Sequence, residues 1–151
     1  MLKIILAGDN HGDLDSIRQI LYENQFADYY FHTGDSGVDP KMIEPFITVR
    51  GNNDWNKDLP KYRVINIEDH KILLMHGDGY TYSIDALVYR AQEEECDIVF
   101  FGHTHAFFDK TIGGVRLINP GSTYYNRTLE DPCYAIVAID GKDVKVTQKF
   151  I

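Results

Sequence analysis

The chain has 151 residues, 44% of them hydrophobic, which is typical of one domain with a packed core. Its 15 basic and 23 acidic residues give a net charge of −8, so the surface repels phosphate backbones and we expect no nucleic-acid partner. The first apolar stretch, Ile4 to Ala7, is too short for a signal peptide or a membrane span, so we expect a cytoplasmic protein with no membrane partner.

The N-terminal half alternates strands with a helix. Leu2 to Ala7 is a short apolar run, which is typical of a buried strand. Asp13 to Asn24 carries apolar residues at helical spacing, and Asp13 or Asp15 can cap its first turn. Two further strands are expected at Asp28 to His32 and Phe46 to Val49. A strand, a helix and a strand at this spacing predict a parallel crossover unit.

The second half is dominated by hairpins. A helix is expected at Ser83 to Glu95, with an apolar stripe on one side. The expected strands are Tyr62 to Ile67, His70 to Met75, Ile98 to Phe101, Phe107 to Ile112, Val115 to Ile118, Cys133 to Ile139 and Val144 to Phe150. Turn residues join three pairs of these strands, which predicts mixed sheets in two layers with helices outside, in a single domain spanning residues 1–151.

Five strand ends are each followed by glycine together with a carboxylate, imidazole or amide. These segments are Gly8-Asp9-Asn10-His11-Gly12, His32-Thr33-Gly34-Asp35, Gly51-Asn52-Asn53-Asp54, His76-Gly77-Asp78 and Gly102-His103-Thr104-His105. The carboxyl ends of strands in open α/β sheets converge on one crevice, where ligands bind. Glycine permits a sharp exit from the strand and a close approach of the backbone. We therefore expect the polar residues of these segments to form one site.

The residue types in these segments are metal ligands. The candidate ligands are Asp9, His11, Asp35, Asn52, His76, His103 and His105. A mixed set of oxygen and nitrogen donors suits manganese, iron, zinc or nickel better than calcium, which prefers oxygen alone. Seven ligands are too many for one tetrahedral zinc ion, whereas two ions that share a carboxylate would use all of them.

Each candidate ligand alone also has an ordinary structural explanation. An aspartate before a helix, such as Asp9, is commonly an N-cap, and a histidine beside an apolar strand is commonly a hydrogen-bonded core or surface residue. Asparagine in a Gly-Asn-Asn-Asp segment is typical of turns. The joint pattern favours a site, because independent caps and turns have no reason to recur in this order at successive strand ends.

In this order the motifs resemble those of the calcineurin-like metallophosphoesterase superfamily. The matching motifs are Asp9-Asn10-His11, Gly34-Asp35, Gly51-Asn52-Asn53-Asp54, His76-Gly77 and Gly102-His103-Thr104-His105. The short length and the later Asn119-Pro120-Gly121-Ser122 segment are similar to its small, single-domain YfcE-like phosphodiesterase branch. The resemblance implies an α/β fold, namely a four-layer α/β/β/α sandwich of two mixed β-sheets flanked by helices.

The resemblance also implies a cofactor and an activity. It implies two divalent transition-metal ions, with manganese favoured and nickel, iron or zinc as alternatives. It assigns Asp9, His11, Asp35 and His105 to the first ion, and Asp35, Asn52, His76 and His103 to the second. The implied enzyme is a phosphodiesterase or phosphatase that hydrolyses small phosphate esters by in-line attack of a metal-bridging hydroxide.

One position departs from the family pattern. Many members have histidine after the metal-binding asparagine, where it protonates the leaving oxygen or holds the phosphoryl group; here the residue is Asn53. Asparagine supplies no proton near pH 7 but can donate a hydrogen bond, so Asn53 is a candidate catalytic and substrate-binding residue. Asp54 is the second catalytic candidate, although a turn or supporting role is also open. We expect modest turnover and a preference for leaving groups that need little protonation.

Two other functions are considered. One is a non-catalytic protein-binding scaffold on the same fold, resembling the retromer subunit; such proteins tend to lose ligands, and none of the seven is missing here. The other is a nuclease, which would need a basic groove or an added domain that this short acidic chain does not indicate.

A few residues outside the motifs carry further expectations. Tyr80 and Tyr82 can wall a substrate pocket, although ordinary surface packing is the simpler interpretation. We expect His32 to be a core or site-supporting residue and His70 to be exposed. Phe107 and Phe108 begin a hairpin, and one of them must face away from its own sheet, which favours a homo-oligomer, either a dimer or a tetramer. The segment Asn119 to Ser122 is expected to brace the metal-binding loops.

Overall fold

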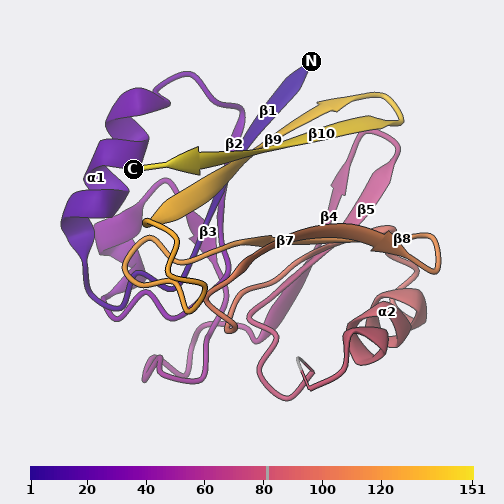
Figure 1. The fold of residues 1–151 in the computed structure, drawn as a ribbon, viewed down its shortest axis with the longest axis horizontal. Helices are drawn as coiled ribbons and strands as arrows, with labels where there is room; N and C mark the ends of the chain where they lie inside the picture. Colours follow the sequence, from indigo (N-terminus) through magenta and orange to yellow (C-terminus); the bar gives the residue numbers. More distant parts are fainter. Residues whose placement is uncertain (81) are drawn as a thin grey trace.

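The computed structural model describes residues 1–80 and 82–151, and it has four layers (Figure 1). Its elements are β1 (Leu2–Ala7), α1 (Leu14–Glu23), β2 (Tyr29–His32), the 3-10 helix η1 (Pro40–Ile43), β3 (Ile47–Thr48), β4 (Tyr62–Ile67), β5 (His70–Met75), α2 (Ile84–Glu93), β6 (Ile98–Phe100), β7 (Phe107–Ile112), β8 (Val115–Pro120), β9 (Cys133–Asp140) and β10 (Asp143–Phe150). One five-stranded sheet has the order β10-β9-β1-β2-β3, and the other has the order β4-β5-β6-β8-β7. Helix α1 covers the outer face of the first sheet and α2 that of the second (Figure 1). The expected four-layer sandwich of two mixed sheets is confirmed.

Parallel pairing gathers the loops that carry the candidate site. In the first sheet β1, β2 and β3 run parallel, and in the second β5, β6 and β8 do so. The remaining strands are antiparallel, with β9 and β10 extending the first sheet and β4 and β7 forming the edges of the second. The crossover units β1-α1-β2 and β5-α2-β6 therefore repeat one arrangement, and the segments after the parallel strands meet at one end of the sandwich.

Strand alternation explains the three parts of the core. In β1, Ile4 and Leu6 face the second sheet, whereas Ile5 and Ala7 face α1. The central cluster lies between the sheets and includes Phe31 and Phe100, while two outer clusters lie under the helices. Both sheets are therefore covered by core residues on their two faces. This packing fixes the positions of the loops at the strand ends.

The predicted element boundaries agree with the structure to within two residues at every end. Of the two proposed N-cap residues, Asp13 is the one that caps α1. Its Oδ1 accepts hydrogen bonds from the Asp15 and Ser16 amides at 3.1 and 3.5 Å. The short helix η1 is missing from the prediction. No helix in the described part of the chain has the length and apolar character needed to cross a membrane.

One expectation about a single side chain is wrong. His70 is buried rather than exposed, because its Nδ1 lies 2.6 Å from Asp97 Oδ2 and its Nε2 lies 2.9 Å from the Gly141 carbonyl oxygen. Phe107 packs on the central cluster and Phe108 packs on the cluster under α2, and both are partly buried. The homo-oligomer stays a prediction.

Candidate metal centre

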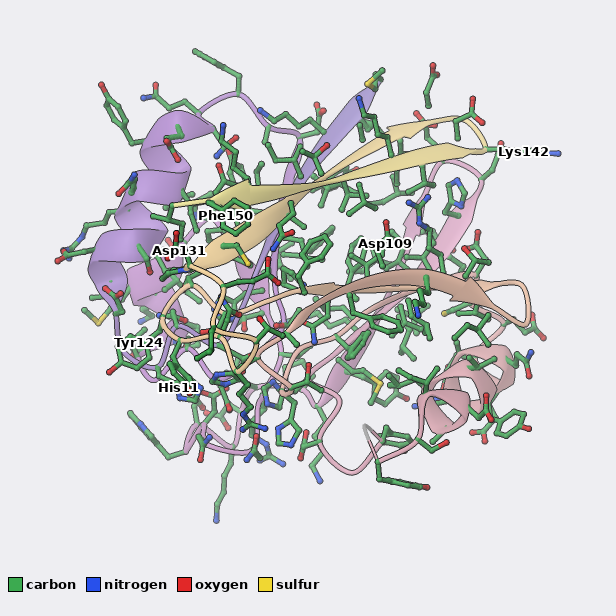
Figure 2. All side chains as sticks on the ribbon, in the orientation of Figure 1. His11, Asp109, Tyr124, Asp131, Lys142 and Phe150 are labelled. Carbon is green, nitrogen blue, oxygen red and sulfur yellow. The ribbon has the colours of Figure 1, made fainter. Side chains whose placement is uncertain are left out.

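All seven candidate ligands lie at the end of the sandwich where the parallel strands finish. His11 marks this end in Figure 2, and Lys142, in the β9–β10 turn, marks the opposite end. The ligands come from both sheets, in the segments that follow β1, β2, β3, β5 and β6. The structure thus brings together side chains that are up to 96 positions apart, from Asp9 to His105.

His76 Nε2 is the centre of one group of ligand atoms. It lies 2.9 Å from Asn52 Oδ1, 3.2 Å from Asp35 Oδ2 and 3.3 Å from His103 Nδ1. Asn52 Oδ1 in turn lies 3.1 Å from His103 Nδ1. These four residues are the set that the sequence assigns to the second ion.

A second group lies beside the first. His11 Nε2 and His105 Nε2 are 3.1 Å apart, and they lie 3.9 and 3.6 Å from Asp9 Oδ1. Asp35 Oδ2 faces both groups, since it is also 3.9 Å from His11 Nε2. Asp9 does the same, because its Oδ1 is 3.8 Å from His76 Nε2. Both carboxylates lie between the two groups, and Asp9 is shared as much as Asp35, the residue that the resemblance assigns as the bridge.

The Asp9 carboxylate has fewer hydrogen-bond partners than a buried charged group needs. Asp9 is fully buried, and its Oδ1 has no hydrogen-bond partner, while Oδ2 accepts one hydrogen bond from the His103 amide at 3.0 Å. Burial, followed by repulsion from Asp35, raises the pKa of Asp9 to about 7 against the attraction of His76. A buried carboxylate oxygen without a hydrogen-bond partner, among imidazole nitrogens, is an environment that fits a bound cation.

Asp35 and His76 show how this excess of negative charge is balanced by protons. Burial opposes ionisation of Asp35. The hydrogen bond and charge of His76 and two hydrogen bonds from Asn53 nevertheless hold the pKa of Asp35 below its usual range. Burial also opposes ionisation of His76, but Asp35 and Asp9 raise the pKa of this imidazole to about 9. A divalent cation offers both carboxylates a stronger partner than this proton, so the donor set fits a metal.

Backbone contacts orient two of the imidazoles with a nitrogen toward the centre. His76 Nδ1 donates to the Thr33 carbonyl oxygen at 2.9 Å, and His105 Nδ1 donates to the Tyr125 carbonyl oxygen at 2.9 Å. In both rings Nε2 is then the atom that faces the other ligands, which is the arrangement typical of metal-binding histidine. Sequence reasoning missed Thr33 and Tyr125, because a backbone carbonyl leaves no mark on residue type.

Five candidate ligands have a left-handed backbone, which non-glycine residues rarely adopt. Of the eight non-glycine residues with positive φ in the described chain, five are Asp9 (53°), His11 (45°), Asp35 (57°), His103 (72°) and His105 (53°). Each such conformation costs of the order of 1–2 kcal/mol. Strain concentrated on the residues that face one centre indicates that function, rather than stability, selects their conformation.

Two glycines leave the space that the carboxylates occupy. A Cβ on Gly51 would lie 2.0 Å from Asp35 Oδ1, and a Cβ on Gly102 would lie 2.7 Å from Asp9 Oδ2. Neither φ lies in the left-handed region, so the requirement is for space. The expected close approach of the backbone therefore applies to the segments after β3 and β6.

Asn53 and Asp54, the two other candidates, contact the loop that carries Asp35. The Asn53 amide donates to Asp35 Oδ1 at 2.8 Å, and its Nδ2 donates to Asp35 Oδ2 at 3.0 Å. Asp54 Oδ2 accepts hydrogen bonds from the backbone amides of Asp35 at 2.8 Å and Gly51 at 2.7 Å. Asp54 thus ties two ligand-bearing loops together, in line with the supporting role that the sequence left open.

The segment Asn119 to Ser122, at the end of β8, holds two further loops in place. Asn119 Nδ2 donates to the Gly102 carbonyl oxygen at 3.1 Å and to Thr104 Oγ1 at 3.0 Å. Ser122 Oγ donates to the Asp9 carbonyl oxygen at 2.8 Å. The expected bracing by this segment is confirmed. Neither serine near the site is arranged as a nucleophile, since Ser36 and Ser122 direct their hydroxyls to backbone carbonyl oxygens.

Comparison with known proteins agrees with this geometry. The family model of the calcineurin-like phosphoesterase superfamily domain matches residues 2–142, which is most of the chain. The chain belongs to this superfamily. The expectation drawn from the five motifs is therefore confirmed.

Relatives within the phosphoesterase superfamily match along most of their own length. A protein of Bacillus subtilis named probable metallophosphoesterase YsnB is 28% identical over 144 residues, covering 92% of this chain and 85% of the relative. A phosphodiesterase of Methanocaldococcus jannaschii is 27% identical over 143 residues, covering 80% and 83% of the two chains.

Solved structures match over nearly the whole fold. A conserved protein of Streptococcus pneumoniae described as a predicted phosphoesterase has a TM-score of 0.89 and 32% identity, covering 97% of this chain and 88% of that one. Vps29 from Entamoeba histolytica, in a structure described as a complex with zinc, has a TM-score of 0.79 and 22% identity, with 97% and 98% coverage. At that identity the likeness to Vps29 concerns the fold alone.

Proposed function

We propose that this phosphoesterase hydrolyses small phosphate esters, diesters in particular, with two divalent metal ions held by the seven clustered side chains. The observation that carries the proposal is the buried Asp9 Oδ1, which lacks a hydrogen-bond partner and has Nε2 atoms of three histidines within 3.9 Å. The family assignment and a relative named phosphodiesterase support the reaction class.

The ligand set supports two ions. Three oxygen and four nitrogen donors exceed what one ion of this class binds with protein ligands alone, and they form two adjacent groups with Asp9 and Asp35 between them. We assign Asp9, His11, Asp35 and His105 to one ion, and Asp35, Asn52, His76 and His103 to the other. Manganese is the favoured metal because mixed carboxylate and imidazole donors suit it, and the same donors accept nickel, iron or zinc.

When bound, a pair of such ions activates water as a nucleophile and polarises the phosphoryl oxygens for an in-line displacement. Asp9 and Asp35 do not neutralise two divalent charges, so the centre attracts a phosphate although the protein as a whole is acidic. Asn53 and Asp54 keep Asp35 in a fixed position through their hydrogen bonds to its side chain and its backbone amide. The left-handed backbone of five ligands holds them in position before any substrate arrives.

Asn53 determines which esters react well. Its amide group hydrogen-bonds Asp35 and provides no proton for the departing oxygen, and loss of a general acid costs about 10²–10⁴-fold in rate. We therefore propose that the enzyme prefers leaving groups that depart as stable anions, and that the rate falls steeply as the leaving group becomes more basic.

A protein-binding scaffold is the alternative, and the likeness to Vps29 is the observation that favours it. Metal binding alone does not separate the two functions, because one of those neighbours is itself described with zinc. The complete ligand set and the strained ligand backbones favour catalysis, since a scaffold has no need of either.

Reconstitution with metal tests the proposal. Protein stripped with a chelator and reloaded with Mn²⁺, Ni²⁺ or Zn²⁺ is expected to bind up to two ions per chain, measured by inductively coupled plasma mass spectrometry. Loading is expected to restore hydrolysis of bis-p-nitrophenyl phosphate, and ethyl p-nitrophenyl phosphate is expected to react far faster than ethyl phenyl phosphate. Full loading without hydrolysis of any activated monoester or diester would leave the scaffold as the better function.

A further inference from the structure

A cleft extends from the candidate metal centre along the edge of the second sheet. One hollow of about 300 Å³ is lined by Arg50, Gly51, Asn52, Asp54, Lys61 and Asp78. A second, of about 320 Å³, is lined by Lys61, Tyr62, Met75, Asp78, Tyr80 and Arg90. Because Lys61 and Asp78 line both hollows, the two form one cleft that begins at the metal ligand Asn52 and ends at α2.

The half of the cleft nearest the metal centre contains two basic side chains and two carboxylates. Arg50 and Lys61 line it, and within the described residues neither side chain forms an ion pair. Asp54, which also lines it, is already occupied by backbone amides. Arg50 and Lys61 are therefore available to bind an anionic group, such as the phosphate of a substrate, while Asp78 lies at the junction with the far half.

The far half of the cleft presents flat and apolar surfaces that are fixed in position. Tyr62 and Met75 are opposite each other in the β4–β5 pair. The Arg90 guanidinium carbon lies 4.7 Å from the centre of the Tyr62 ring, and Arg90 Nη1 donates to Glu94 Oε1 at 2.7 Å. A ring or planar ligand group entering this half would therefore meet surfaces that need no reordering.

The third wall comes from the loop of a metal ligand. Tyr80 follows His76 by four residues, its amide donates to the Gly77 carbonyl oxygen at 3.0 Å, and its side chain packs on the cluster under α2. Asp78, from the same turn, is exposed where the two halves of the cleft join. A carboxylate at that position is suited to accept hydrogen bonds from sugar hydroxyls.

We propose that this cleft binds the nucleoside part of the substrate, so that the preferred substrates are nucleotide phosphodiesters; this rests on the proposed function. The phosphate lies toward Arg50 and Lys61, the sugar hydroxyls toward Asp78, and the base among Tyr62, Tyr80 and Arg90. The volume of each half is at the lower end of the range of about 300–1,000 Å³ for small-molecule sites, and the aromatic and apolar lining of the far half is typical of such sites. Stacking of a base on aromatic side chains tolerates any base, so the cleft selects a class of compound.

Ligand binding to the metal-free protein tests the proposal without turnover. Adenosine 5′-monophosphate is expected to bind at least about tenfold more tightly than ribose 5-phosphate, measured from chemical-shift changes in two-dimensional NMR spectra. Tyr80→Leu is expected to remove this difference. Tyr62→Leu, at a 43% exposed side chain, serves as a second variant if Tyr80→Leu loses its fold, and Tyr89→Leu, a 63% exposed tyrosine of α2 outside the cleft, is the matched control. Equal binding of the two phosphates by the native chain would overturn the proposal.

Kinetics separate this proposal from the proposed function. The metal-loaded enzyme is expected to have a KM at least about tenfold lower for p-nitrophenyl thymidine 5′-phosphate than for ethyl p-nitrophenyl phosphate, which has the same leaving group. Tyr80→Leu is expected to raise KM for the nucleotide ester alone, with kcat little changed. Hydrolysis of the ethyl ester reports on the proposed function, so equal KM values for two substrates that are both hydrolysed would overturn the nucleoside site alone.

Discussion

The two ends of the sandwich each bring histidine and aspartate into contact, with opposite consequences. At the end away from the ligand loops, His70 has Asp97 at one ring nitrogen and the Gly141 carbonyl oxygen at the other, and Asp97 also accepts the Lys71 amide at 2.8 Å. Every polar atom of that imidazole has a partner. At the other end, His11 Nε2 and His105 Nε2 face each other at 3.1 Å beside a carboxylate oxygen of Asp9 that has no hydrogen-bond partner.

The difference shows that a contact between histidine and aspartate does not by itself identify a functional site, whereas a buried polar atom without a hydrogen-bond partner does. The contact of His70 with Gly141 joins the start of β5 to the β9–β10 turn and so links the two sheets, while Asp97 holds the other side of the ring. The backbone around the His70–Asp97 pair includes two left-handed non-glycine residues, Glu68 in the β4–β5 turn and Glu95 after α2, but neither member of the pair itself is left-handed. The ligand cluster instead combines unmet polar atoms with strained backbone, which stability alone would not select.

One aspartate substitution in each cluster gives the strongest test of this difference. Asp35→Asn is expected to lower kcat/KM for bis-p-nitrophenyl phosphate by more than about 10²-fold, because it removes a shared ligand and its charge from the reacting centre. The circular dichroism spectrum is expected to stay the same. Asp97→Asn is the matched substitution at the other end, and it is expected to leave kcat/KM unchanged while lowering the free energy of unfolding by about 1–2 kcal/mol. A similar loss of activity in both variants would contradict the distinction between the two clusters.

The space beside Asp35 provides the next test. Gly51→Ala places a Cβ 2.0 Å from Asp35 Oδ1, so the carboxylate must move away from the centre. We expect the affinity for Mn²⁺ to fall by about 10–100-fold, as for other changes that displace a ligand without removing it. The control is Gly79→Ala, where φ is +85° and no atom lies within 4 Å, so only backbone strain is added. Isothermal titration of both variants measures the effect, and equal affinities would show that Asp35 is free to move.

The sequence predicted the fold well because the signals are local and repeated. The alternation in Leu2–Ala7, the stripe of the helix Leu14–Glu23 and the three hairpin turns each depend on residues near one another in the chain. The layer count came from family resemblance, since no periodicity states which sheet faces which. The helix Pro40–Ile43 was missed because four residues give too short a pattern.

The candidate ligands were predictable because glycine-flanked polar residues follow strand ends, whereas their supports were not. Thr33 and Tyr125 act through backbone carbonyl oxygens, which any residue type supplies. The burial of His70 depends on Gly141, which is 71 positions away, and no nearby residue indicates that contact. The cleft beside the site joins Arg50, Tyr62, Tyr80 and Arg90 from four separate segments, so its lining is a property of the tertiary fold.

A third histidine sharpens the comparison, because it is completely paired and yet lies next to the ligand loops. His32 is fully buried, its Nδ1 accepts the Gly34 amide at 3.0 Å, and its Nε2 therefore carries the proton and donates to Asn10 Oδ1 at 2.8 Å. Burial, followed by the nearby charge of His76, lowers the pKa of His32 to about 3 from 6.5. Protonation of Nδ1 would place its N–H group against the Gly34 N–H group, between the loops that carry Asp9 and Asp35.

Because the folded pKa of His32 is depressed, its contribution to stability is complete above pH 6.5 and is lost as the pH falls toward 3. Between pH 6 and pH 5 the free energy of unfolding is expected to decrease, relative to His32→Gln, by up to about 1.4 kcal/mol per pH unit. Urea unfolding of both proteins in chelator measures this, and Asp9 and His76 are present in both. If the free energies of unfolding of the two proteins depend on pH in the same way, His32 accepts a proton as easily in the folded state as in the unfolded state. Its hydrogen bonds with Gly34 and Asn10 would then not hold the imidazole neutral.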